Sequence, residues 1–274
     1  MAGAAAGLVA ATHALAQEAF ISNAPYFPTP QSTVDRMLEL AQVGPDDFVV
    51  DLGSGDGRIV ITAAKKFGAR GMGVEIEPGL VSLSRYEAGR AGVAERVKFV
   101  TEDLFTTDLR PVTVLTLYLF RELNLRLRPR ILEELHPGAR VVTHDWDMGE
   151  WEPDVAETIP APDKAVGIVR ESKIFLWYVP AKLEGTWRLD APLAAGGSAT
   201  LSFAQRFQLF DGVLDHAGAR YPVTAGRARG TAVRFRIADG PFAGDYSGTA
   251  AQNEVSGEIL RYGAPAGAWK AVRE

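Results

Sequence analysis

One segment restricts the fold of this chain more than any other: an apolar run, a glycine-rich loop and an amphipathic helix in direct succession. The apolar run covers residues 47–52, and glycines follow at positions 53, 55 and 57. Apolar side chains then recur on one helical face of residues 57–67, at Ile59, Val60, Ala63, Ala64 and Phe67. A strand that turns sharply into a helix through glycines is typical of the first βα unit of a parallel sheet.

The alternation of strands and helices continues to residue 144. The pattern predicts strands at 71–76, 97–101, 112–119 and 139–144, and helices at 32–42, 78–91 and 122–135. Ser32 and Asp35 are spaced as a capping box for the first helix, and Pro129 predicts that the last one is kinked or split. An apolar run at 173–179 adds a late strand. Strands separated by helices imply βαβ crossovers, hence an α/β fold with a mostly parallel, Rossmann-like sheet.

The pattern changes after Pro180. In residues 231–237, for example, Val233, Phe235 and Ile237 alternate with arginines, and glycine-rich turns separate such runs. This predicts a small appended antiparallel β-domain, either a barrel or a sandwich. Four aromatic residues are its expected core: Trp187, Phe242, Tyr246 and Trp269. We therefore expect two domains, at 24–181 and 183–274.

The N-terminal residues have a different composition. Residues 1–16 contain no Lys, Arg, Asp or Glu and end in a small-x-small pattern at Ala14 and Ala16, as a signal peptide does. The first basic residue is Arg36, so the positive start of a secretory signal is missing. Two interpretations stay open: a signal peptide, which would make the protein periplasmic or secreted, and a disordered terminus of a cytoplasmic protein. The segment is too short and alanine-rich for a membrane span.

Composition excludes several classes of site. The 274-residue chain is 47% hydrophobic and 23% charged, as expected of a folded globular protein. Its net charge of −5 gives no general reason to bind nucleic acid or an anionic membrane. It contains no cysteine, which rules out disulfides, thiolate metal ligands and a cysteine nucleophile.

The acids of the glycine loop discriminate between nucleotide cofactors. A dinucleotide fingerprint requires a third glycine where this chain has Arg58, and Asp51 and Asp56 would repel a pyrophosphate. The same acids suit S-adenosylmethionine (SAM), whose methionine end carries an ammonium and whose sulfur is cationic. We therefore predict SAM as cofactor, with its methionine side held by Asp51, Gly53, Gly55 and Gly57.

Two further acids follow the next strands. Glu75 ends the second strand, where a carboxylate can accept both ribose hydroxyls, and Asp103 follows the third, where it can accept the adenine amino group. Either acid alone would read as a solvated turn residue. Together with Asp51 they occupy three successive strand ends, which indicates one shared ligand.

Three strings resemble a known family: PYFPTP, DLGSGDGRIVITAAKKFGARGMGVEIEP and VTVLTLYLFRELNLRLRPRILEELHPGARVVTHDWDMGEW. They are similar to the family of the mitochondrial ATP synthase c-subunit lysine methyltransferase and its bacterial relatives, which are class I, seven-β-strand methyltransferases. The resemblance covers residues 24–155 and does not reach the C-terminal β-domain. It implies transfer of a methyl group from SAM to a lysine side chain.

Methyl transfer to an amine requires alignment, exclusion of water and an unprotonated nitrogen. Tyr26 and Phe27, in the proline-rich segment, could cover the cofactor and close an apolar slot that favours a neutral amine. Tyr118, at the end of the fourth strand, stands where class I methyltransferases place residues that line the acceptor site. The alternative for Tyr118 is a core tyrosine.

Polar residues follow the fourth and fifth strands. His144 could act as a general base or anchor the corner between strand and loop, and Asp145 and Asp147 could recognise a basic substrate. A metal site built from these three matches no recognised spacing, so no metal is predicted. Glu122 and Asn124 could line the acceptor entrance or cap the next helix.

The sequence leaves other functions open. A small-molecule methyltransferase would use the β-domain to shape its acceptor pocket, and a non-catalytic SAM-binding scaffold would bind SAM without turnover. An NAD-linked oxidoreductase is disfavoured by Arg58 and the acidic loop. The β-domain could be a docking module, a dimerisation element or a lid, and no oligomeric state is favoured.

Overall fold

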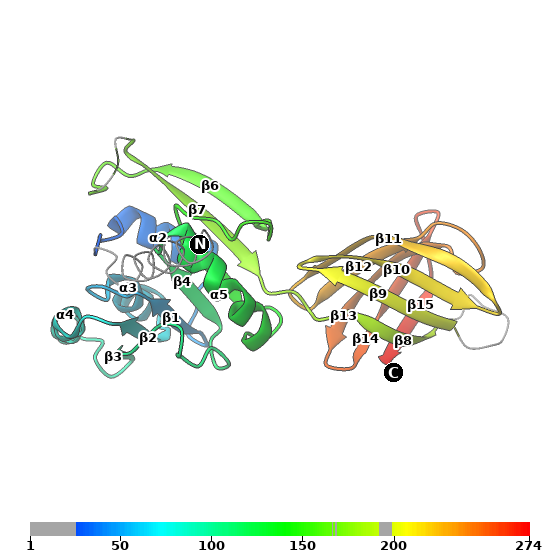
Figure 1. Ribbon diagram of the computed structural model, residues 1–274, viewed down its shortest axis with the longest axis horizontal. Coiled ribbons are helices and arrows are strands. Elements are labelled where there is room, and N and C mark those ends of the chain that lie inside the picture. The colour runs from blue at the N-terminus through cyan, green and yellow to red at the C-terminus, as the bar shows by residue number, and fades with distance from the viewer. Residues whose placement is uncertain (1–25, 166, 168, 192–198) are drawn as a thin grey trace, which may run out of the picture.

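The computed structural model describes residues 26–165, 167, 169–191 and 199–274. The suggested signal peptide at 1–16 lies outside the described residues. The described chain forms an α/β unit followed by a β-barrel, and Figure 1 shows the two beside each other along the long axis. A short connection at 179–184 joins them. No helix in the described part of the chain is long and apolar enough to span a membrane.

A seven-stranded sheet forms the α/β unit. Its strands are β1 (Phe48–Leu52), β2 (Arg70–Glu75), β3 (Val97–Thr101), β4 (Val114–Leu117), β5 (Arg140–His144), β6 (Val155–Pro160) and β7 (Glu171–Tyr178). They lie in the order β3-β2-β1-β4-β5-β7-β6, with β1 to β5 parallel and β7 antiparallel to both of its neighbours. The predicted Rossmann-like sheet is confirmed. The sequence pattern missed β6, whose alternating side chains are only half-buried.

In the described part of the chain, four helices cover the two faces of this sheet: α2 (Gln31–Leu40), α3 (Arg58–Phe67), α4 (Pro78–Arg90) and α5 (Arg121–Glu134). Alternate residues of a strand face opposite ways, so both faces need cover. Val49 of β1 packs in one core with α2 and α3, whereas Val50 packs in the other with α5. This burial on both faces explains why the parallel strands read as continuous apolar runs.

Two local predictions about the helices were incomplete. The capping box of Ser32 and Asp35 was wrong, because α2 begins at Gln31 after Pro30 and has no side-chain cap. Helix α5 runs through Pro129 without splitting. Leu127 and Ile131, on either side of the proline, are both fully buried in the same core, which holds the two halves in one helix.

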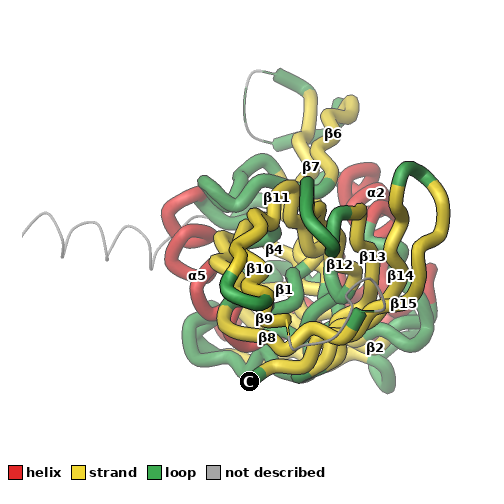
Figure 2. Tube along the Cα trace, turned by 90° about the vertical axis from the view of Figure 1, so that its right-hand side faces the viewer, coloured by secondary structure: helices red, strands yellow, loops and turns green. Residues whose placement is uncertain are grey.

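The C-terminal unit is a closed barrel (Figure 2). Its strands are β8 (Gly185–Asp190), β9 (Ala199–Arg206), β10 (Leu209–His216), β11 (Ala219–Arg229), β12 (Ala232–Ile237), β13 (Gly244–Ala251), β14 (Glu254–Arg261) and β15 (Ala264–Arg273). Closure between β8 and β15 removes the exposed sheet edges that an open sheet would present.

Aromatic rings fill the barrel. All four predicted core residues are buried, and the ring of Tyr246 stacks on that of Phe235 with centroids 4.7 Å apart. The arginines of β12 point outward, as the alternation predicted, and Arg236 pairs with Asp245 on β13. A core packed in this way stabilises the barrel through burial of large apolar surfaces.

One hairpin tip fixes the barrel to the α/β unit. Phe207, between β9 and β10, stacks on Trp151 with ring centroids 6.4 Å apart and lies under the Arg128 guanidinium at 5.1 Å. An ion pair of 3.2 Å between Arg227 and Asp154 lies at the same joint. The barrel is therefore held against α5 and the segment that follows β5.

Replacing Phe207 with alanine tests this joint. We expect Phe207→Ala to destabilise the protein by about 1–3 kcal/mol and to separate the melting of the two units, because the stacked ring is lost. Calorimetric unfolding measures both effects. Tyr262→Ala is the matched control, since Tyr262 is an aromatic residue at another hairpin tip and is 101% exposed. Equal effects of the two substitutions would contradict the proposed role of Phe207.

Candidate active site

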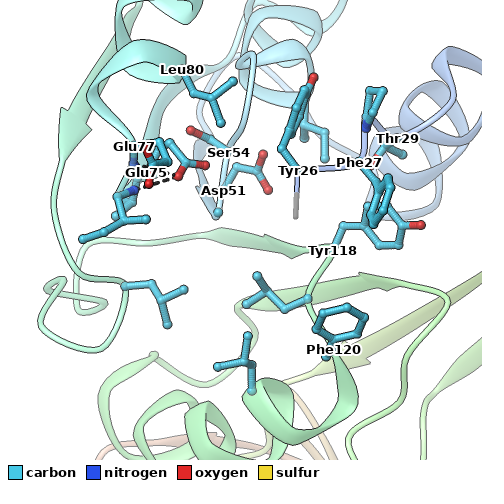
Figure 3. A pocket seen from close by; sticks show the side chains of 18 of the residues that line it. Tyr26, Phe27, Thr29, Asp51, Ser54, Glu75, Glu77, Leu80, Tyr118 and Phe120 are labelled. Atoms are coloured by element: carbon cyan, nitrogen blue, oxygen red, sulfur yellow. Dashed lines mark hydrogen bonds between the residues drawn. The ribbon is translucent and has the colours of Figure 1, made fainter. Parts of the chain in front are cut away.

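A pocket of about 800 Å³ opens at the carboxyl ends of the parallel strands. Figure 3 shows Glu75 and Glu77 at one end, Asp51 and Ser54 in the middle, and Tyr26, Phe27 and Tyr118 at the other. The pocket brings together most of the residues predicted from sequence: Tyr26, Phe27, Asp51, Gly53, Glu75, Asp103 and Tyr118. No barrel residue within the described ranges lines it.

The remaining two predicted residues, Gly55 and Gly57, act through the backbone rather than the pocket wall. All three loop glycines have left-handed φ angles, of 79°, 52° and 78° for Gly53, Gly55 and Gly57. A Cβ at Gly55 would lie 2.2 Å from the Tyr26 ring, and one at Gly57 would lie 2.6 Å from Phe99. The glycines therefore permit both the turn into α3 and the close approach of two aromatic rings.

Asp51 is a carboxylate buried at the end of β1. Its side chain accepts a hydrogen bond of 2.8 Å from the Thr116 hydroxyl on β4. Burial raises the pKa of Asp51 to about 7, and the nearby charges of Glu75 and Asp56 add to that shift. Because a positive ligand would stabilise the ionised form, this position favours a cation.

Glu75 and Asp103 hold the loops around the pocket. The Glu75 carboxylate accepts from the backbone N–H groups of Gly55 at 2.9 Å, Ile76 at 2.8 Å and Glu77 at 3.1 Å. These bonds occupy three of about four lone-pair sites, so contact with both ribose hydroxyls would require one of them to open. Asp103 accepts from the Phe105 N–H at 2.8 Å and is otherwise exposed.

Arg58, which replaces the third glycine of a dinucleotide fingerprint, anchors the segment that covers the loop. Its guanidinium pairs with Asp56 at 2.6 Å and donates to the Thr29 carbonyl at 2.8 Å. The pKa of Tyr26 is raised to about 12 by burial, by the charge of Asp56 and by a hydrogen bond to it. Tyr26 is therefore a neutral phenol fixed over the glycine loop.

Tyr118 forms one wall at the other end of the pocket. Its ring packs against that of His144, with centroids 4.0 Å apart and the ring planes tilted by 31°. Burial, the charge of Asp145 and a hydrogen bond to Asp145 raise the pKa of Tyr118 to about 12. Phe120 and Trp146 meet edge to face beside it, with centroids 6.3 Å apart, and both line the pocket. Tyr118 is thus neither fully buried nor a core residue.

His144 lies behind Tyr118 and outside the pocket lining. The side chain is fully buried, and its Nε2 lies 2.8 Å from the Ser172 hydroxyl on β7. Burial lowers the pKa of His144 to about 4, so the ring is neutral at physiological pH. This geometry matches the anchoring interpretation and does not support a general base.

Asp145 is bound to a lysine that no sequence pattern singled out. The Lys164 ammonium, from the connection between β6 and β7, lies 2.6 Å from Asp145 Oδ2 and donates to the Glu171 carbonyl at 2.7 Å. Asp145 has a positive φ of 63°, and its Oδ1 accepts from the Lys173 N–H at 3.1 Å. Both Asp145 and Lys164 line the pocket.

Three other polar candidates lie outside the pocket lining. Asp147 pairs with Arg121 at 3.1 Å, and Glu122 is exposed. Asn124 is fully buried and donates to the Trp146 carbonyl at 3.1 Å, so it supports the loop after β5. Within the described residues, no group of three or more His, Asp or Glu side chains could hold a metal ion.

Comparisons with known proteins identify relatives of the part of the chain that forms this pocket. A family model described as the ANTKMT methyltransferase domain matches residues 51–155, and one described as histone methylation protein DOT1 matches 7–91. A protein-lysine N-methyltransferase of Saccharolobus islandicus is 42% identical over 135 residues, which cover 49% of this chain and 84% of that protein.

Two further matches extend the comparison. The human lysine N-methyltransferase of the ATP synthase c-subunit is 34% identical over 47% of this chain and 55% of its own length. Among solved structures, the chain is similar to an RNA methyltransferase from Salinibacter ruber, crystallised with S-adenosyl-L-homocysteine. The sequences are 48% identical and the TM-score is 0.51, and the match covers 57% of this chain and 95% of that one. This chain belongs to the class I SAM-dependent methyltransferases. The matching family models end before the barrel.

The described side chains of this methyltransferase fit SAM. Seven acids line the pocket (Asp51, Asp56, Glu75, Glu77, Glu102, Asp103 and Asp145) against three bases (Arg58, Arg126 and Lys164). That excess suits a ligand with an ammonium and a sulfonium. The buried Ser54 Oγ, also in the pocket wall, lacks a hydrogen-bond partner among the described residues, which leaves it for a ligand.

The raised pKa of Asp51 predicts a pH-dependent cofactor affinity. SAM should bind up to about tenfold more weakly for each unit of pH below 7, because protonation removes the charge that faces the cationic ligand. Titration calorimetry between pH 5.5 and 7.5 measures this. Asp51→Asn should bind weakly at every pH, and an equally flat profile for the wild type would contradict the prediction.

Protonation of Asp51 does not destabilise the ligand-free protein, so unfolding caused by this group does not interfere with the binding measurement. The folded-state pKa of about 7 lies above the ordinary aspartate pKa of 3.8, so protonation of Asp51 stabilises the ligand-free protein. This contribution is fully present below pH 3.8 and is lost as the pH rises through 7.

The glycine loop gives a stability prediction. Gly57→Ala should lower the free energy of unfolding by about 1–3 kcal/mol, because the new Cβ meets Phe99 at a left-handed φ. Gly89→Ala, in helix α4 with open space around it, should be neutral or stabilising by up to about 1 kcal/mol. Denaturant unfolding compares the two, and a neutral Gly57→Ala would argue against a constrained loop.

Proposed function

We propose that this enzyme transfers the methyl group of SAM to the side-chain amine of a lysine in a protein acceptor. The observation that carries the proposal is the pairing of Asp145 with a lysine ammonium at 2.6 Å inside the pocket. Lys164, the Lys173 N–H and Tyr118 occupy three of the roughly four lone-pair sites of this carboxylate, which leaves one for the amine of a second lysine. The relatives named as protein-lysine N-methyltransferases support the same acceptor.

Each end of the pocket has a proposed task. At the cofactor end, Asp51, Gly53, Gly55, Gly57, Glu75 and Asp103 hold SAM, which supplies a methyl group already activated by its sulfonium. At the acceptor end, Tyr26, Phe27 and Tyr118 enclose the lysine in an apolar slot. Removal from water favours the neutral amine and aligns it with the methyl group.

Asp145 orients the acceptor amine in this proposal. Its carboxylate is hydrogen-bonded to Tyr118, whose raised pKa keeps the phenol protonated. Tyr118 therefore donates to Asp145 and does not itself act as a base. An incoming lysine would reach the same carboxylate, past the rings of Phe120 and Trp146 at the pocket wall.

The alternative acceptors have less support from the pocket. A small-molecule enzyme with a barrel-shaped acceptor site would need barrel residues in the wall, and no described residue of the barrel lies there. One solved relative is an RNA methyltransferase, but seven acids against three bases around this pocket would repel a phosphate backbone. The same acidic wall attracts a lysine-rich segment.

A labelled-methyl assay distinguishes these acceptors. The full-length enzyme is incubated with labelled SAM and, separately, with the protein, RNA and small-molecule fractions of a host lysate, and the products are hydrolysed and identified. Methyl-lysine in the protein fraction is expected. Methylated nucleotides or metabolites alone would overturn the lysine proposal, and binding of SAM without any turnover would indicate a scaffold.

Asp145→Asn tests the orienting role. We expect the KM for a lysine acceptor to rise about 10- to 100-fold, because a charge-assisted contact worth about 1.5–3 kcal/mol is lost. SAM affinity should stay within about twofold of wild type. Asp147→Asn is the matched control, two residues away, exposed at a surface ion pair and expected to change KM by less than about twofold. Equal effects of the two variants would remove Asp145 from the acceptor site.

A further inference from the structure

Lys164 occupies an unusual place for a lysine. Its side chain is only 11% exposed, and it lies in the wall of the methyl-transfer pocket rather than on the surface. Lys173, nine residues further along on β7, is exposed by contrast. Lys164 therefore presents an amine to the pocket in which this enzyme class transfers methyl groups.

The contacts of the Lys164 nitrogen leave room for one new bond. A lysine ammonium has three N–H donors. One points to the Glu171 carbonyl at 2.7 Å, and Asp145 Oδ2 lies 2.6 Å from the same nitrogen. Among the described residues no third partner is present. Loss of one proton would leave a lone pair while both existing contacts are kept.

We propose that Lys164 is a modification site of this enzyme, methylated once on Nζ by its own active site. The inference rests on the proposed lysine specificity and extends it to a lysine of the chain itself. The unprotonated Lys164 nitrogen donates its lone pair to the methyl carbon, and a C–N bond forms as the C–S bond breaks. The C–S electron pair stays on sulfur, and the proton lost beforehand goes to solvent.

The contacts explain why one methyl group is expected. Monomethyl-lysine is a cation with two N–H donors, which matches the two partners, Asp145 and Glu171. A second methyl would leave one donor, so one of these partly buried acceptors would lose its bond. The product should therefore stop at the monomethyl state, because an unpaired buried acceptor is destabilising.

The transfer should occur within one molecule. Lys164 is too buried to enter the pocket of a second copy without opening of the β6–β7 connection. The lysine is already positioned in its own pocket, so the step is unimolecular and needs no docking of a partner. Its rate should not depend on protein concentration.

Mass spectrometry tests the site directly. Full-length protein is incubated with SAM carrying a heavy methyl group, together with an unrelated lysine-rich protein, and its peptides are analysed. We expect one heavy methyl on Lys164, at a rate unchanged by tenfold dilution, and none in Lys164→Arg. Lys173→Arg is the matched control and should retain the label. An unlabelled methyl on Lys164 in protein as purified, absent from Glu75→Ala, would also support the proposal.

The outcomes separate this inference from the proposed function. Methylation of the added protein with Lys164 unmodified would overturn the inference and leave lysine specificity intact. Absence of label from both would overturn the inference, and the lysate assay would then decide lysine specificity separately. Label only on exposed lysines such as Lys173, or a rate that falls on dilution, would also overturn methylation within one molecule.

A measurement without cofactor checks the placement of Lys164. In ligand-free protein, an amine-reactive reagent should modify Lys164 at least about tenfold more slowly than Lys173, because the nitrogen of Lys164 is paired and its side chain is only 11% exposed. Asp145→Asn should raise the reactivity of Lys164 and leave that of Lys173 unchanged. Equal reactivity of the two lysines in the wild type would show that Lys164 is not held in the pocket, and the inference would fail.

Discussion

A buried carboxylate at the end of the first strand is the constraint on which the rest of this structure depends. Asp51 is removed from water, and because burial penalises the charged form, its pKa is raised to about 7. The Thr116 hydroxyl offsets part of that penalty. A cationic ligand would complete the compensation, so an enzyme that binds SAM can place an acid where a nucleotide enzyme would keep a neutral turn.

A second carboxylate, that of Asp145, lies at the acceptor end of the pocket. Asp145 follows β5 as Asp51 ends β1, and each is positioned to bind a cation at the carboxyl edge of the sheet. Aromatic side chains line the pocket between them, including Tyr118, Phe120 and Trp146. Arg58 contributes indirectly, because its pairing with Asp56 fixes the segment that carries Tyr26 over the glycine loop.

The barrel is stabilised independently of this chemistry. Its aromatic core is separate from the cores of the α/β unit, and the Phe207 joint sets it against α5. None of the barrel residues within the described ranges lines the pocket, so a role as lid finds no support in the geometry. A docking surface for a protein acceptor, or a dimerisation element, is compatible with its position.

The sequence by itself determined the elements whose residues are close along the chain. The glycine loop, Asp51, Glu75 and Tyr118 lie at the carboxyl ends of strands that read as apolar runs, because both faces of a parallel sheet are buried and its carboxyl ends share one edge. Only the tertiary structure decided the acceptor end. Strand β6 is half-exposed and lacks a clear pattern, so the hairpin that brings Lys164 to Asp145 was not predicted. Likewise, the sequence left His144 open as a base or an anchor, and only its burial against Ser172 and Tyr118 favours the neutral anchor. Pairing and desolvation depend on residues distant in sequence, and local patterns do not encode them.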